Sequence, residues 1–411
     1  MTKPYGRIGA AHGAAAIPGQ VASAESSARQ RAGTEGSEPA ADFDAKLVKK
    51  SFAHAAAVGP AVMEFFYTRL FAESPDIRSL FPMTMTPLRE HVFASLTEVI
   101  ATLDSQPDCA ELLGRLGRDH RRFGVRDRHH QAFFAAMVET AQHFIGTDWR
   151  PEVESAWRGA VGYICATMQA AAAQAAGTPA WWIAEIVGHE LRSPGVAVVT
   201  LAPSQPLRYL PGQYVPVQVT RWPRVWRPFS VANAPRSSGL IELHVRAVPG
   251  GLVSNSLVYH SAEGDTVLLG SADGGMTLTD SGRDLLCVAG STGLAPIKAL
   301  IEQVISESVA EPQRKITLFY GARQQFDLYD LQDLQLLESA YAGLRVVTVL
   351  SEEPGFSGLK GTLPDVLHAH GTSVFGDTEA YICGPEPMVR QTAALLAATI
   401  PADRIHYDPV R

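Results

Sequence analysis

The hydrophobic pattern of this chain changes twice along its length, and that change restricts the folds open to it. From about residue 43 to 176, apolar side chains recur at helical spacing, as in Phe65-Phe66 followed by Leu70-Phe71. Short β-branched runs separated by turn residues follow, and from about residue 285 continuous apolar strands alternate with helices. One core cannot satisfy three such patterns, and 411 residues suffice for two or three domains.

We therefore predict a multidomain fold: an all-α domain, then an antiparallel β-barrel, then an α/β domain with a doubly wound parallel sheet. The predicted boundaries are residues 43–176, 177–280 and 281–411, preceded by a disordered tail over residues 1–42. The tail is rich in Ala, Gly and Ser, and it lacks the basic start and apolar stretch of a secretion signal.

Charge and cysteine content narrow the classes of function. The 35 basic and 42 acidic side chains leave a net charge of −7, which argues against nucleic acid or anionic lipid as the main partner. No apolar run approaches the length of a membrane span. The four cysteines have no CxxC spacing, so we expect no zinc site or disulfide framework and a reducing, cytoplasmic location. As partners we expect small molecules.

The clearest motif of the barrel region is Arg227-Pro-Phe-Ser230. A guanidinium group matches phosphate geometry, and an aromatic face supports a flat ring system. The segment resembles the RxYS motif of the ferredoxin-reductase superfamily, in which Arg binds the FAD pyrophosphate and the aromatic residue packs on the flavin. This resemblance implies an FAD site that includes Arg227, Phe229 and Ser230. Phe229 replaces the usual Tyr, so a hydroxyl contact to the flavin is lost.

Two further motifs accompany it in the order of that superfamily. Pro211-Gly-Gln213-Tyr214 resembles a companion loop, which adds Gln213 and Tyr214 to the expected FAD contacts. Gly250-Gly251-Leu-Val-Ser254 resembles the turn against the flavin phosphates, where glycines let backbone N–H groups approach an anion. Three motifs in this order favour an FAD site over an ordinary surface strand.

A glycine turn in the last third indicates a nicotinamide dinucleotide site. Residues 289–296, Ala-Gly-Ser-Thr-Gly-Leu-Ala-Pro, follow a strand and open a helix. They resemble the GxGxxP turn of the same superfamily, with Ser291 in place of its first glycine. The residues that this resemblance assigns to the cofactor are Gly290, Ser291, Thr292, Gly293 and Pro296.

A second segment supports that site. Cys383-Gly384-Pro385 ends a later strand and resembles the CGP motif that lies beside the hydride-transfer position. Alone, Cys383 would be read as a buried strand cysteine, but the following Glu-Pro-Met completes the motif. Arg323, after the second strand, is expected near the adenosine ribose. No acidic residue stands beside it in the sequence to select against a 2′-phosphate, so NADH and NADPH both stay open.

The helical domain carries a histidine suited to iron. Leu113, Leu116 and His120 lie on one side of a helix, although a lone histidine at such spacing is more often a core or capping residue. Residues 116–125, Leu-Gly-Arg-Asp-His-Arg-Arg-Phe-Gly-Val, are similar to the proximal-histidine segment of flavohaemoglobins. That similarity implies His120 as the iron ligand.

Two aromatic residues extend the similarity. Phe81, in Leu-Phe-Pro, resembles the phenylalanine that packs against the porphyrin in that family. Tyr67 falls at the family's distal tyrosine, whose hydroxyl donates a hydrogen bond to bound oxygen. Tyr67, Phe81 and His120 occur in the family's order and spacing, which favours these roles over ordinary core packing.

From about residue 43 to its end, the chain thus resembles flavohaemoglobins, and more narrowly their divergent actinobacterial branch. The resemblance implies haem b, FAD and NADH or NADPH as cofactors, with oxygen and nitric oxide as substrates. It also implies nitric oxide dioxygenase activity, in which electrons from NAD(P)H pass through FAD to haem and bound oxygen converts nitric oxide to nitrate.

Several positions depart from the family pattern. Leu88 occupies the distal glutamine position, and Val92 lies one turn on, so we expect a more apolar pocket. His91 is adjacent to these positions. We interpret it as a solvated helix residue in preference to a second iron ligand. His130 and Ala172 replace a proximal Tyr-Glu pair that makes the imidazole more anionic, so we expect a higher iron potential and weaker peroxidase-like reactivity.

Two other readings stay open. Substitutions at Phe229 and Ser291, together with Val410 near the family's flavin-shielding aromatic, suggest a flavin dehydrogenase whose donor is a hydroxy acid such as lactate. Leu88 and the missing proximal pair instead suggest a haem-based oxygen or redox sensor. The nicotinamide motifs favour the dioxygenase over the sensor, and the choice between dioxygenase and hydroxy-acid dehydrogenase stays open. The end of the chain, Ile405-His-Tyr-Asp408, matches the family's last strand, with Asp for the usual Glu.

Overall fold

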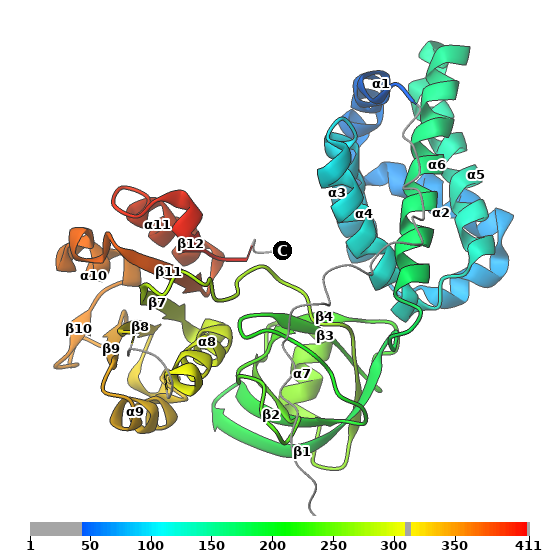
Figure 1. Ribbon diagram of the computed structural model, residues 1–411. Helices are drawn as coiled ribbons and strands as arrows, with labels where there is room; N and C mark the ends of the chain where they lie inside the picture. The colour runs from blue at the N-terminus through cyan, green and yellow to red at the C-terminus, as the bar shows by residue number, and fades with distance from the viewer. Residues whose placement is uncertain (1–42, 309–313, 409–411) are drawn as a thin grey trace, which may run out of the picture. The chain divides into compact units, whose positions relative to one another are not determined.

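Helices alone form the first part of the chain in the computed structural model, which describes residues 43–308 and 314–408 (Figure 1). The predicted tail, residues 1–42, and Val410 lie outside these ranges. Pro87 and Pro151 stand in the first turns of α3 and α6, where a missing N–H costs nothing. The expected all-α domain is confirmed. Its helices are α1 (Ala45–Val58), α2 (Val62–Glu73), α3 (Thr86–Thr102), α4 (Gln106–His120), α5 (Asp127–Ile145) and α6 (Pro151–Gln174).

Helices α4 and α6 cross at close distance, and this crossing fixes the position of the C-terminal end of α4. Gly117, one turn before His120, packs so tightly that an added Cβ would collide with the Met168 backbone on α6. Leu113 on the same helix is completely buried, as is Met63 on α2. The helix that ends at His120 is therefore held on its neighbour by direct backbone approach.

The second part is an antiparallel sheet of six strands, in the order β4-β3-β6-β1-β2-β5. Val231, directly after β4, bridges to Leu243 on β5, which brings the two ends of the sheet together as predicted for a barrel. Ile241, Leu243 and Val245 point into its core. The strands are β1 (Trp182–Ser193), β2 (Val196–Pro203), β3 (Tyr214–Val219), β4 (Arg227–Ser230), β5 (Ile241–Arg246) and β6 (Thr266–Leu269).

One helix of this part was not predicted from the sequence pattern. Helix α7 (Leu252–Tyr259) begins directly after the glycines of the turn that the sequence predicted. Val253 and Leu257 are completely buried against the barrel, so tertiary packing stabilises eight residues that would be too few for an isolated helix. The barrel is thus plugged by a short helix whose first turn carries Ser254.

The third part is a six-stranded parallel sheet in the order β10-β9-β8-β7-β11-β12, with helices on both faces. One apolar cluster packs beneath α8 and α9, and a second packs beneath α10 and α11. The doubly wound α/β fold is confirmed. Its elements are β7 (Asp284–Gly290), α8 (Leu294–Glu307), β8 (Ile316–Ala322), α9 (Leu331–Ala340), β9 (Leu344–Leu350), β10 (Leu359–Lys360), α10 (Leu363–His370), β11 (Thr378–Cys383), α11 (Glu386–Leu396) and β12 (Ile405–His406).

The strand order reverses between β7 and β11, and we call the carboxyl end of these two strands the switch-point crevice. Successive strands run outward from β7 to β8 and β9, whereas β11 pairs with the other side of β7. In open α/β sheets, ligands bind where the strand order reverses, outside the carboxyl ends of the strands. That reversal lies between Gly290 and Cys383. The last strand is shorter than expected, because β12 ends at His406 and leaves Asp408 beyond it.

Residues 41–411 cluster as one compact unit. Among the described residues, none of the helices is both long and apolar enough to cross a membrane.

The turn before β3 supplies a test of the barrel geometry. Gly212 has a φ of +92°, and an added Cβ would also collide with the Met276 carbonyl oxygen. Gly239 has a φ of +69° but open space around it. We expect Gly212→Ala to lower the free energy of unfolding by about 3 kcal/mol or more, against about 1 kcal/mol for Gly239→Ala. Equal losses in denaturant titrations would contradict the close approach of residue 212 to residue 276.

Candidate functional site

Tyr67 lies in a cluster of aromatic rings in the helical domain. Its ring centroid is 5.4 Å from that of Phe81 and 5.7 Å from that of Phe71. Only 4% of Tyr67 is exposed, and burial raises the pKa of its hydroxyl well above the usual range despite the nearby charge of Arg89. The phenol therefore stays protonated and can act as a hydrogen-bond donor.

Helix α3 adds an apolar side to this region. Leu88 and Val92 are one turn apart and half-buried, and Val92 packs against the same core as Tyr67. His91, between them, is exposed. The helix thus turns Val92 toward the core that contains Tyr67, and Leu88 is half-buried one turn before it.

His120 is the last residue of α4, and one hydrogen bond fixes its ring. Its Nδ1 lies 2.7 Å from the Leu116 carbonyl oxygen. A carbonyl only accepts, so Nδ1 carries the proton and Nε2 presents a lone pair. Burial lowers the pKa of His120, which keeps the imidazole neutral. A neutral, oriented imidazole is the ligand that haem iron requires.

The surroundings of His120 lack the family's Tyr-Glu pair. His130, on α5, is half-buried, and its pKa is lowered by burial and then by the neighbouring His120. Ala172, on α6, offers no polar group. A neutral histidine and an alanine cannot make the iron ligand more anionic as a carboxylate would.

One contact next to this histidine, between Arg122 and Trp226, was not predicted from the sequence. The guanidinium of Arg122 lies 5.0 Å from the ring centroid of Phe123 and 5.6 Å from that of Trp226, at cation–π distance. Trp226 directly precedes Arg227. Only the fold reveals this contact, because the two aromatic partners are about a hundred residues apart in the chain.

The predicted FAD motifs meet on two adjacent strands. In the β3–β4 ladder, Tyr214 pairs with Ser230, and residue 215 pairs with Phe229. Gln213 accepts a hydrogen bond at its carbonyl from residue 231, so it lies beside the same strand. Arg227 is exposed, and its guanidinium donates a hydrogen bond to the Trp226 carbonyl. Because the side chain is exposed, it can turn from this contact toward a phosphate.

The turn at the start of α7 contains a polar atom without a partner. Ser254 is 8% exposed, and its buried Oγ has no hydrogen-bond partner within the described part of the chain. Gly250 has a φ of +73°, and a Cβ on Gly251 would collide with that same hydroxyl. A buried hydroxyl beside two glycines at a helix N-terminus fits a phosphate group, which would accept its hydrogen bond.

The nicotinamide motifs meet at the switch point of the parallel sheet. A Cβ on Gly293 would collide with the Cys383 carbonyl, and a Cβ on Gly290 would lie 3.0 Å from Pro385. Pro296 is buried in the first turn of α8, and Gly384 has a φ of +154°. The two motifs, about 90 residues apart in sequence, therefore lie in direct contact at the switch-point crevice.

Ser291 shows why the family has glycine at its position. Its φ is +55°, a left-handed conformation that costs a serine roughly 1 kcal/mol. Its hydroxyl accepts a hydrogen bond of 2.9 Å from Nε of Arg246 on β5. Thr292, next to it, is half-buried. The serine is tolerated because an arginine of the barrel binds its side chain.

Burial raises the pKa of the Cys383 thiol to about 12. The thiol is therefore neutral at physiological pH, so it acts as a small packing group beside the crevice and not as a nucleophile.

A cavity of about 630 Å³ lies at the carboxyl end of β8, lined by residues 324–326 and 352–354. Arg323, beside it, is exposed and forms an ion pair of 3.6 Å with Glu352. Glu353 accepts a hydrogen bond of 2.6 Å from the Gln325 backbone. The sequence shows no acidic residue next to Arg323. In the fold, however, two acidic residues that follow the neighbouring strand β9, Glu352 and Glu353, lie at this cavity.

Comparisons with known proteins agree with this division of the chain. Residues 64–168 match the globin family, residues 185–276 match the oxidoreductase FAD-binding domain, and residues 287–394 match the oxidoreductase NAD-binding domain. A flavohemoprotein of Bordetella pertussis is 26% identical over 85% of this chain and 93% of that protein.

Relatives of the reductase half are more similar in sequence but share less of the chain. The xylene/toluene monooxygenase electron transfer component of Pseudomonas putida is 36% identical over 47% of this chain, which spans 55% of that relative. The structure of a Malassezia yamatoensis flavohemoglobin with bound FAD and heme matches 88% of this chain and 98% of that one, with a TM-score of 0.70. At 14% identity, this last likeness shows the fold alone.

Fold and comparisons together define an oxidoreductase in which a globin is joined to an FAD- and NAD-binding reductase. In the order and identity of its three domains, the chain is similar to flavohaemoglobins along most of its length. Its cofactors are haem, FAD and a nicotinamide dinucleotide, and the neutral His120, the unpartnered Ser254 hydroxyl and the glycine-lined crevice fit these three groups.

The hydroxyl of Ser254 provides a test of the FAD assignment. Ser254→Ala removes a buried group that has no partner without FAD, so we expect the apoprotein to keep or gain stability. FAD affinity should fall about tenfold, because one hydrogen bond to a charged acceptor is lost. Thermal unfolding of the apoprotein and fluorescence titration with FAD measure the two effects.

Ser256→Ala is the matched control on the same helix. The Ser256 hydroxyl already donates to the Leu252 carbonyl and accepts from Trp222, so its loss should destabilise the apoprotein. If Ser254→Ala instead destabilises the apoprotein and leaves FAD affinity unchanged, Ser254 is a structural residue and not a phosphate ligand.

Proposed function

We propose that this protein is a nitric oxide dioxygenase that uses NADH, FAD and haem to convert nitric oxide and oxygen to nitrate. The buried, protonated hydroxyl of Tyr67 carries the proposal, because oxygen chemistry at haem needs a donor on the distal side. The proposal includes the divergent actinobacterial branch, the domain boundaries predicted above and a cytoplasmic location. Haem supplies oxygen binding and one-electron chemistry, and FAD converts a hydride to single electrons.

On the haem side, each residue has a separate task. We assign Nε2 of His120 to the iron and the Tyr67 hydroxyl to a hydrogen bond with the oxygen ligand. Phe81 would pack on the porphyrin face, while Leu88 and Val92 keep water out of the distal side. An apolar distal wall leaves Tyr67 as the main donor there, so ligand stabilisation rests more heavily on one hydroxyl than in relatives with a distal glutamine.

On the reductase side, the residues mainly bind and position. We assign Arg227, Ser230, Gly250, Gly251 and Ser254 to the FAD phosphates. Phe229 and the loop residues Gln213 and Tyr214 would flank the flavin. The crevice formed by residues 290–293 and Pro296 with residues 383–385 would hold the nicotinamide and pyrophosphate, since its glycines allow backbone contact.

The direct test is nitric oxide consumption by the purified, haem- and FAD-loaded protein. We expect an electrode to record consumption that requires both oxygen and NADH, with nitrate formed in equal amount. Parallel flavin reduction by NADH, NADPH and lactate distinguishes a nicotinamide donor from a hydroxy acid. Consumption that is absent under oxygen and NADH, with a fully reducible haem, would reject the dioxygenase.

Substitution of the distal tyrosine tests its role. Tyr67→Phe removes one buried donor worth about 1–3 kcal/mol, so oxygen should dissociate about 5- to 150-fold faster. Laser photolysis or stopped-flow displacement by carbon monoxide measures this rate. Tyr341→Phe makes the same change at a buried tyrosine of the α/β domain and should leave the rate unaltered. An unchanged rate in Tyr67→Phe would remove Tyr67 from the site.

We propose NADH as the preferred donor because two carboxylates stand beside Arg323. A 2′-phosphate carries close to two negative charges, which Glu352 and Glu353 would repel. The double substitution of both residues by Gln should lower the NADH-to-NADPH ratio of kcat/KM about tenfold. Glu154→Gln, at an exposed ion pair on α6 of the helical domain, is the control. A ratio that does not move would show that these carboxylates do not select the donor.

A further inference from the structure

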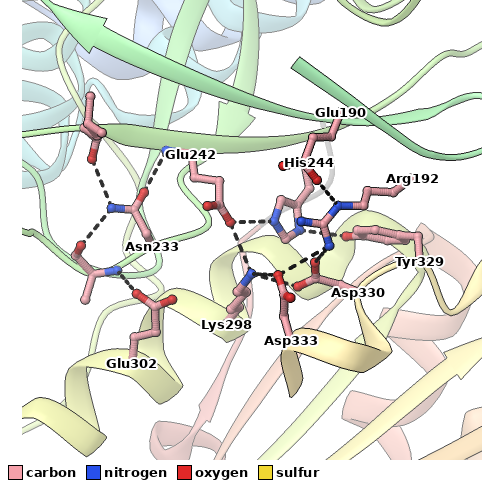
Figure 2. A network of polar contacts seen from close by, with 12 residues as sticks. Glu190, Arg192, Asn233, Glu242, His244, Lys298, Glu302, Tyr329, Asp330 and Asp333 are labelled. Atoms are coloured by element: carbon pink, nitrogen blue, oxygen red, sulfur yellow. Dashed lines mark hydrogen bonds and ion pairs between the residues drawn. The ribbon is translucent and has the colours of Figure 1, made fainter. Parts of the chain in front are cut away.

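Alternate residues of strand β5 form a polar row on the outside of the barrel. Glu242, His244 and Arg246 share one face of the strand, while the intervening residues fill the barrel core. This row lies against α8 and the segment that leads into α9 (Figure 2). We call Glu242, His244 and Arg246 with their partners Lys298, Tyr329 and Asp330 the docking network.

A buried lysine of α8 is at the centre of this network. Nζ of Lys298 lies 2.8 Å from Asp330 and 3.2 Å from Glu242 (Figure 2). Lys298 is 4% exposed and Asp330 is completely buried. The same ammonium thus binds a carboxylate of the barrel and a carboxylate of the α/β domain.

Other side chains complete the charges around it. Arg192, on β1, lies 3.2 Å from Asp330 and 3.3 Å from Asp333. The His244 ring lies 2.8 Å from the Tyr329 hydroxyl and 3.1 Å from Glu242. Burial alone would raise the pKa of Glu242, but His244 and Lys298 outweigh it and hold that pKa at about 2. The carboxylate is therefore ionised throughout the physiological range.

Such an arrangement is specific in geometry. Buried ion pairs contribute little net stability, because desolvation offsets their attraction, yet loss of one partner leaves an unpaired buried charge. Their contribution is to favour one arrangement of the packed elements over others. Here the arrangement concerns β5 against α8 and the start of α9.

The row ends at the nicotinamide crevice. Arg246 donates to the hydroxyl of Ser291 and lies 3.8 Å from Asp327. Ser291 is the left-handed residue of the turn after β7. The register between β5 and the α/β domain therefore sets where that turn lies relative to the barrel. Hydride transfer needs reacting atoms about 3–3.5 Å apart, and an error of 1 Å can cost about 100-fold in rate.

We propose that Lys298 is a positioning residue for hydride transfer: its contacts to Glu242 and Asp330 fix the α/β domain on strand β5 so that the nicotinamide faces the flavin. This inference rests on the FAD and nicotinamide sites and not on nitric oxide chemistry. A protein that fails to consume nitric oxide would leave it intact.

The experiment uses the full-length protein loaded with haem and FAD. After anaerobic mixing with NADH, we expect Lys298→Met to lower the limiting rate of flavin reduction at least tenfold. FAD content and the dissociation constant for NADH should change less than threefold. The absorbance of the nicotinamide–flavin charge-transfer complex should be lost, because the two rings no longer align.

Arg236→Met is the matched control. The half-exposed Arg236 also links the barrel to α8, through Glu302 at 2.8 Å, but Glu302 keeps a hydrogen bond from the Ala234 backbone. This variant should reduce its flavin at the normal rate. A normal rate in Lys298→Met, or an equal loss in Arg236→Met, would overturn the proposal.

A double variant separates alignment from stability. In Lys298→Met with Asp330→Asn, Glu242 still has His244 and Asp333 still has Arg192, so thermal stability should recover. Flavin reduction should stay slow in the double variant. In the absence of nicotinamide, amide exchange at the first turn of α9 should be faster in this variant than in the unsubstituted protein. If the rate recovers along with stability, Lys298 has only a structural role and the proposal is wrong.

Discussion

In our proposal, the haem chemistry of this chain depends on a single hydrogen bond, from Nδ1 of His120 to the Leu116 carbonyl. It fixes the tautomer, so the other ring nitrogen has a lone pair to offer a metal. Burial keeps the imidazole neutral, and the tight packing of Gly117 on α6 holds the helix that carries it. If His120 binds the iron as proposed, its loss would leave the reductase half without a haem to which it could pass electrons.

The reductase half depends on a different constraint, the close approach of backbone segments. At the switch point of the parallel sheet, a Cβ on Gly293 would collide with the Cys383 carbonyl, and one on Gly290 would lie only 3.0 Å from Pro385. Strand β5 of the barrel is joined to the α/β domain by two contacts, Arg246 with Ser291 and Glu242 with Lys298 on α8. Two sites that need atomic alignment are thus connected by charged groups, which define direction and distance better than apolar contacts do.

Much of this could be predicted from the sequence. The switch from helical to alternating to strand–helix periodicity predicted the three parts and their order, because each pattern reflects how an element buries one face. The FAD and nicotinamide motifs were identified by their resemblance to motifs of the ferredoxin-reductase superfamily, in which glycines and an arginine have fixed places. The structure brings these motifs together in two places, the β3–β4 ladder with its neighbouring turn and the crevice at β7 and β11.

What the sequence could not predict depends on contacts between distant residues. Helix α7 is too short for a periodic signal, and only burial of Val253 and Leu257 stabilises it. Glu352 stands beside Arg323 because adjacent parallel strands end at the same sheet edge. In the sequence, Lys298 stands between apolar residues of α8. Its partners lie 32 to 56 positions away in the chain, so no local pattern marks them.

The most direct measurement is anaerobic stopped-flow mixing of the loaded protein with NADH under carbon monoxide, with flavin and haem absorbance followed together. The account predicts that flavin absorbance falls first and that the ferrous carbonyl band of haem then rises, at a rate independent of protein concentration. A haem that stays ferric while the flavin is fully reduced would contradict it. So would a haem reduction rate that rises in proportion to protein concentration, because electrons would then pass between molecules.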